Sequence, residues 1–284
     1  MKSLCIKTNN SNIINYLTED FNKLNLSDVY ISISTFKIYK NVIIHYKGTD
    51  IDLFINSISS LLANAIILFF EEQLINNIIN SEFFYFTPCE KNSIKSLALS
   101  TLKSDFANYY YNYNCIFTSL ATYISENKSL ILNGFVYFRL KEYVSSLENF
   151  VSCCVNDFII TKEYQDLISI LKLYINSKSP SQEFNEVHLI YINNNKALLT
   201  DKNKQMISTS NSSHKILSDI SFSNNDFVFN TLIELCPEKI HIHLIHSTPD
   251  EFINTLELIF ENKLSICTDC NICELYKIMS YTNE

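Results

Sequence analysis

The stretch that decides the fold runs from residue 239 to residue 267 and reads KIHIHLIH, STPDEFINTLELIFEN and KLSIC. Its first and last parts have the apolar composition of strands. Between them, Thr248-Pro249-Asp250-Glu251 supplies a helix cap, a proline at the first helical position and two acidic groups for the positive end of the helix. Strand, helix and strand with short connections predict a βαβ unit with two parallel strands.

The residues before this unit complete a C-terminal α/β domain. A hairpin is expected at 186–193 and 196–201, and a helix at 225–236. A polar stretch that contains Pro180, SKSPSQE (177–183), separates these elements from a helical pattern. We therefore predict a domain boundary at this stretch.

The two predicted domains cover residues 1–176 and 184–284. The first begins with a βαββ element within about the first 50 residues. A central helical bundle follows, and Thr49 and Thr161 are the expected caps of two of its helices. The predicted fold class is thus mixed α+β: a βαββ element, a central helical bundle and a C-terminal α/β domain with a βαβ unit.

Charge is distributed unevenly along the 284 residues. The net charge is −8, and residues 181–284 carry 7 basic and 14 acidic side chains. Nucleic-acid binding requires a basic face that neutralises phosphates. We therefore expect no nucleic-acid partner for the C-terminal domain.

The cysteines and the apolar segments indicate a compartment. The first ten residues lack the apolar region of an export signal, which predicts a cytoplasmic protein. The nine cysteines are then reduced thiols or metal ligands. The longest apolar run, Leu61 to Phe70, is shorter than the roughly 20 residues of a membrane span and predicts a buried core helix.

Only two glycines, Gly48 and Gly134, occur in the chain. Phosphate-binding loops, the dinucleotide-binding fingerprint and the serine nucleophile elbow each need closely spaced glycines. The sequence therefore excludes these classes in their usual forms, and no catalytic residue can be assigned.

Three cysteines form the sharpest chemical feature of the chain. Cys267, Cys270 and Cys273 follow the last predicted strand at intervals of three residues, and thiolates of this kind bind zinc or an iron–sulfur cluster. Parallel strands end at the same edge of a sheet, so His246 is the expected fourth ligand, with Asp269 as an acidic alternative.

Two simpler interpretations stand beside the metal site. In the first, the three cysteines are free thiols of a cysteine-rich protein that has a poorly ordered C-terminal tail. The second concerns the histidines. His241 and His243 share one face of their strand, whereas His246 points the other way. On this view His241 and His243 belong to a polar strand face and bind nothing.

The chain resembles the YtxC-like family of sporulation proteins over most of its length. The segments that carry the resemblance are FRLKEY (138–143), VNDF (155–158), KEY (162–164), LCPEKI (235–240) and ICTDCNIC (266–273). The resemblance implies a role in endospore formation and implies no activity, substrate, cofactor or catalytic residue.

Two functional hypotheses follow. The first is a non-enzymatic accessory or interaction protein of sporulation, with protein partners of unknown identity. The second is a protein with a cysteine-ligated zinc ion or iron–sulfur cluster, with or without enzymatic activity.

Overall fold

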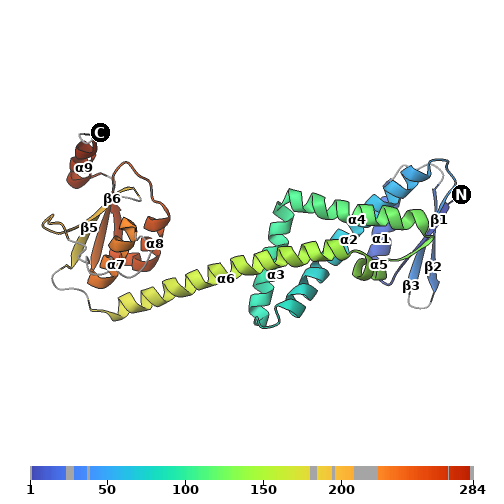
Figure 1. Ribbon diagram of the computed structural model, residues 1–284, viewed down its shortest axis with the longest axis horizontal. Coiled ribbons are helices and arrows are strands. Elements are labelled where there is room, and N and C mark those ends of the chain that lie inside the picture. The colour runs from blue at the N-terminus through green and yellow to red at the C-terminus, as the bar shows by residue number, and fades with distance from the viewer. Residues whose placement is uncertain are drawn as a thin grey trace. The chain divides into compact units, whose positions relative to one another are not determined.

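The computed structural model describes residues 2–23, 29–36, 39–179, 184–193, 196–207, 223–267 and 269–281 (Figure 1). The chain forms two compact units, Met1–Ile160 and Thr161–Glu284. The predicted mixed α+β class is confirmed, with one sheet in each unit. The boundary predicted at 177–183 falls partly outside the described residues and stays a prediction.

The N-terminal unit is built on a four-stranded sheet with the order β2-β3-β1-β4. β1 pairs antiparallel with β3, β3 pairs antiparallel with β2, and β1 pairs parallel with β4. The short strand β4 was not predicted. The bounds of the strands and of the first helix are β1 (Lys2–Thr8), α1 (Ser11–Lys23), β2 (Val29–Phe36), β3 (Tyr39–Tyr46) and β4 (Ser129–Ile131).

Helix α2 (Ile51–Glu82) is the core helix of this unit. Its cap is Asp50, whose side chain accepts a hydrogen bond from the backbone N–H of Leu53, so the prediction of Thr49 as the cap was wrong by one residue. By length and composition alone α2 could cross a membrane, but 56% of its most apolar 18-residue window is buried in the protein. Such burial is typical of a core helix.

The remaining helices of the unit are α3 (Pro88–Ser104), α4 (Phe106–Glu126), α5 (Leu132–Arg139) and the start of α6 (Lys141–Ser177). α6 continues without a break through Thr161, so the helix start predicted there was wrong. Ile168 and Ile175, beyond Thr161, pack into the core of the C-terminal unit. That packing favours a continuous helix over a new start at a local capping residue.

The C-terminal unit contains a second four-stranded sheet with the order β6-β5-β7-β8. β5, β7 and β8 run parallel, and β6 pairs antiparallel with β5 as the predicted hairpin requires. The elements are β5 (Glu186–Asn193), β6 (Lys196–Asp201), α7 (Asn224–Leu235), β7 (Lys239–Leu244), α8 (Glu251–Phe260), a 3-10 turn (Glu261–Lys263), β8 (Leu264–Cys267) and α9 (Asn271–Tyr281).

The predicted βαβ unit is therefore present as β7, α8 and β8. Its helix begins two residues later than expected, because Asp250, and not Thr248, accepts the capping hydrogen bond from the backbone N–H of Ile253. Asp250 also accepts a hydrogen bond from the Tyr191 hydroxyl on β5. This contact between distant parts of the chain ties the helix start to the sheet.

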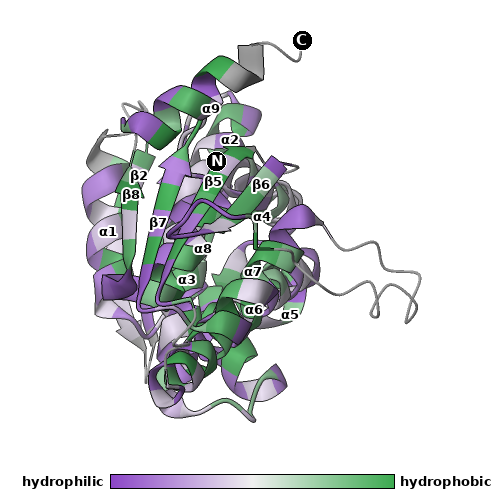
Figure 2. Ribbon diagram, turned by 90° about the vertical axis from the view of Figure 1, so that its left-hand side faces the viewer, coloured by the Kyte–Doolittle hydropathy of each residue, from purple (hydrophilic) through white to green (hydrophobic). Residues whose placement is uncertain are grey.

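The two faces of this sheet differ in chemistry. Hydrophobic and hydrophilic residues alternate along β7 (Figure 2). Ile240, Ile242 and Leu244 are buried in the core that also contains residues of α7 and α8. His241 and His243 belong to the opposite face, on which α9 packs around Ile190 and Cys273. α7 and α8 lie together beside the sheet, and α9 lies away from them (Figure 1).

Candidate metal centre

The three cysteines come together at the junction of β8 and α9. Cys267 ends the strand, Cys270 directly precedes the helix, and Cys273 lies in its first turn. The Cys273 sulfur lies 3.7 Å from that of Cys270 and 4.0 Å from that of Cys267. The backbone N–H of Glu274 donates to the Cys270 carbonyl, so this turn is held as a regular helix start.

The histidine that joins these sulfurs is His243. Parallel pairing of β7 and β8 places His243 directly opposite Cys267. Its Nδ1 atom lies 3.4 Å from the sulfur of Cys270 and 3.4 Å from that of Cys273. One ligand atom from each of the four residues lies within 4.8 Å of every other, so the group can hold a metal ion.

The other two proposed ligands lie outside this group. His246 follows the end of β7 by two residues and has a left-handed backbone conformation with φ of 53°. Asp269 is exposed. The prediction placed a histidine at the carboxyl end of β7, but the register of the strands selects the histidine opposite Cys267.

The electrostatics of the group suit a cation. Burial, together with the neighbouring rings of His188 and His241, lowers the pKa of His243 to about 4, so its imidazole is neutral at pH 7 and has a free lone pair. Burial would raise the pKa of Cys270, but backbone N–H groups at the start of α9 lower it below its ordinary value. The Cys270 thiol therefore loses its proton more readily than an ordinary cysteine.

Cys273 behaves in the opposite way. Burial and its hydrogen bond with Cys270 raise the pKa of Cys273 to about 12. A metal ion that binds here must therefore displace the Cys273 proton, as is usual for thiolate sites. Cys273 has no exposed surface and His243 is only 3% exposed, so a bound ion would be shielded from solvent on that side.

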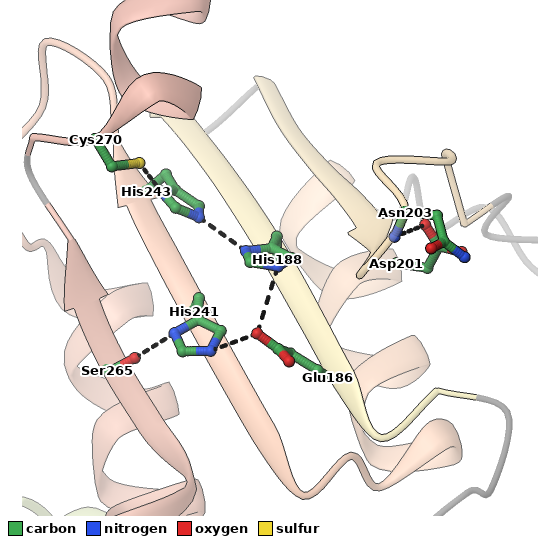
Figure 3. Close-up of polar contacts among 8 residues, drawn as sticks. All are labelled: Glu186, His188, Asp201, Asn203, His241, His243, Ser265 and Cys270. Carbon is green, nitrogen blue, oxygen red and sulfur yellow. Dashed lines mark hydrogen bonds and ion pairs between the residues drawn. The ribbon is translucent and has the colours of Figure 1, made fainter.

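A chain of polar side chains extends from His243 across the face of the sheet (Figure 3). The Nε2 atom of His243 lies 3.0 Å from Nδ1 of His188 on β5. Beyond it, Glu186 contacts both His188 and His241, and His241 contacts Ser265 on β8. Of these residues His188 contacts His243 directly, at the ring nitrogen that is not near the sulfurs.

Sequence reasoning missed His243, His188 and Glu186 as parts of a site. A weak signal was present, because His241 and His243 alternate with apolar residues and so share one face with each other. His188 and Glu186 show the same alternation on β5. The pairing of the two strands, which brings these residues together, is not visible in either segment alone.

Comparison with known proteins supplies one match. A model of the YtxC-like family matches residues 56–265, which are 210 of the 284 residues. The match includes His188 and His243 and ends two residues before Cys267. No curated protein and no solved structure matches the chain.

Proposed function

Because the chain belongs to the YtxC-like family, whose description names no reaction, we propose from the site itself that this is a zinc protein with a structural centre. The ligands are the Nδ1 atom of His243 and the sulfurs of Cys267, Cys270 and Cys273. The centre holds α9 on the open face of the C-terminal sheet, and the protein acts without catalysis through contacts with protein partners.

The spacing of the ligand atoms carries this proposal. Tetrahedral zinc has Zn–S distances of about 2.3 Å and Zn–N distances of about 2.0 Å, which require about 3.8 Å between sulfurs and about 3.5 Å between sulfur and nitrogen. The sulfurs lie 3.7 and 4.0 Å apart, and the sulfur–nitrogen distances are 3.4 Å. The two remaining pairs of ligand atoms, from Cys267 to Cys270 and from Cys267 to His243, lie within 4.8 Å, so all four donors are close enough to share a single ion.

The same spacing favours zinc over an iron–sulfur cluster. A four-iron cluster takes one cysteine on each iron, and a two-iron cluster divides its four ligands between two irons. In both, the four ligand atoms therefore lie farther apart as a set than around one ion. Three thiolates and one imidazole in tetrahedral arrangement are a common ligand set of structural zinc. Zinc also imposes no electronic preference on the geometry, which suits a site formed by a strand end and a helix start.

A structural role follows from the number of ligands. Catalytic zinc usually has three protein ligands and an open position for water or substrate, whereas structural zinc has four. Here four protein donors are present and Cys273 and His243 are buried. The absence of the glycine-dependent motifs of common enzymes supports the same conclusion.

The resemblance to sporulation proteins supports the biological setting. We place the protein in the cytoplasm of an endospore-forming cell, as an accessory component that binds other proteins. In a strain that lacks the gene, sporulation is expected to fall. Normal sporulation of this strain under several conditions would contradict the role without affecting the zinc centre.

Metal analysis of protein purified without oxygen tests the centre. We expect about one zinc per chain, retained through dialysis against buffer without chelator, because four protein ligands enclose the ion. Protein without bound metal, even after incubation with zinc, would contradict the proposal. If the metal analysis finds iron and acid-labile sulfide, the residues hold an iron–sulfur cluster and not zinc.

A further inference from the structure

We propose that His188 is a positioning residue of the zinc centre, which accepts a hydrogen bond from His243 and thereby turns the correct ring nitrogen of His243 toward the ion. The inference rests on the proposed zinc centre and adds a residue that does not touch the metal. The contact that carries it is the 3.0 Å separation between Nε2 of His243 and Nδ1 of His188.

The argument begins with the two nitrogens of His243. Nδ1 lies 3.4 Å from two cysteine sulfurs, so Nδ1 is the atom that would bind the ion. A neutral imidazole carries a hydrogen on only one of its two nitrogens, and the nitrogen that binds a metal carries none. The hydrogen therefore lies on Nε2, which donates it to Nδ1 of His188.

The position of this hydrogen determines the tautomers of the neighbouring histidines. His188 accepts at Nδ1 and so carries its own hydrogen on Nε2, which faces an oxygen of Glu186 at 3.7 Å. The same oxygen lies 3.0 Å from Nε2 of His241, which donates to it. Nδ1 of His241 then accepts from the Ser265 hydroxyl, 2.7 Å away. One set of tautomers is consistent with every contact in Figure 3 from His243 to Ser265, although the 3.7 Å approach of His188 to Glu186 is longer than a hydrogen bond.

The sheet holds the two histidines in this arrangement. β5 and β7 pair in parallel, with His188 beside His241 and Ile190 beside His243. The rings of His188 and His243 stack with centroids 5.3 Å apart, and 15% of the His188 side chain is exposed. Outer partners of this kind orient metal-bound histidines in many proteins, and their loss weakens metal binding about 10- to 100-fold.

Zinc affinity, measured by competition with a chromophoric chelator, tests the inference. We expect His188→Leu to weaken binding about 10- to 100-fold, because it removes the acceptor for His243. His188→Gln retains an acceptor oxygen and is expected to restore part of the loss. The control is His241→Leu. His241 contacts Glu186 and Ser265, and its contacts include no hydrogen bond to His243. We expect this substitution to change zinc affinity by less than about threefold.

A double-mutant cycle separates positioning from a general structural effect. In a His243→Ala background, where three thiolates remain, adding His188→Leu is expected to change zinc affinity no further. A loss that persists in that background, or a His188→Leu protein that binds zinc as tightly as the wild type, would overturn the inference. A wild-type protein that binds no zinc would instead refute the proposed function.

Discussion

Cys273→Ser is expected to abolish stoichiometric zinc binding and to lower the melting temperature of the C-terminal unit by roughly 10 to 20 °C. Cys273 is fully buried and lies within 4.0 Å of the two other sulfurs and of His243. A serine hydroxyl is a poor ligand for zinc in place of a thiolate, because it keeps its proton at neutral pH.

The size of the effect follows from ligand linkage. A ligand present at about 1,000 times its dissociation constant stabilises the folded state by about 4 kcal/mol. The variant loses this contribution. It also loses the link that the ion makes between α9 and the sheet. The other contacts between α9 and the sheet lie in a small hydrophobic cluster around Ile190, Ile245 and Cys273. Hydrogen exchange in Asn271–Tyr281 is therefore expected to rise sharply.

Two comparisons control this experiment. Cys89→Ser changes an exposed cysteine in the N-terminal unit and is expected to alter neither zinc content nor melting. Metal-free wild-type protein is expected to melt close to the Cys273→Ser protein, since both lack the ion. A Cys273→Ser protein that retains zinc and melts like the metal-loaded wild type would show that Cys273 does not bind the ion.

The second large effect is expected in the N-terminal unit. Phe54→Ala is expected to destabilise this unit by about 3 to 5 kcal/mol, the usual range for removal of a buried aromatic side chain. Phe54 is fully buried on α2, and its ring stacks on Tyr46 of β3 with centroids 4.8 Å apart. The truncation leaves a cavity between the sheet and its main helix.

Chemical denaturation measures this effect, and zinc content shows how far it spreads. Leu53→Ala is the matched control, because Leu53 precedes Phe54 and is 46% exposed. It is expected to change stability by less than about 1 kcal/mol. The zinc ligands all belong to the other unit, so Phe54→Ala is expected to keep its zinc. Loss of zinc in this variant would contradict the expectation that damage to the N-terminal unit leaves the metal centre intact.

The sequence predicted features that depend on neighbouring residues. The parallel βαβ unit follows from the composition of residues 239–267, and the three cysteines follow from their regular spacing after the last strand. Features that depend on contacts across the fold were less accessible. The fourth member of the group, His243, is selected by strand register, which places it opposite Cys267. Strand alternation places His243 and His246 on opposite faces, but it does not show which face Cys267 shares.

The misplaced helix boundaries have the same cause. Thr161 has the chemistry of a cap, but the apolar residues after it pack in a core with β5 and β7, so α6 continues to Ser177. Thr248 was an equally reasonable cap by its sequence. Asp250 takes that position, and the Tyr191 hydroxyl on a distant strand contacts its carboxylate. Residues far apart in the sequence decided both outcomes.

X-ray absorption at the zinc edge of the metal-loaded protein tests the central claim most directly, because it counts the ligands and measures their distances. We expect three sulfurs at about 2.3 Å and one nitrogen at about 2.0 Å. A first shell made only of oxygen and nitrogen atoms would contradict the account, because the ion would then not lie among Cys267, Cys270 and Cys273.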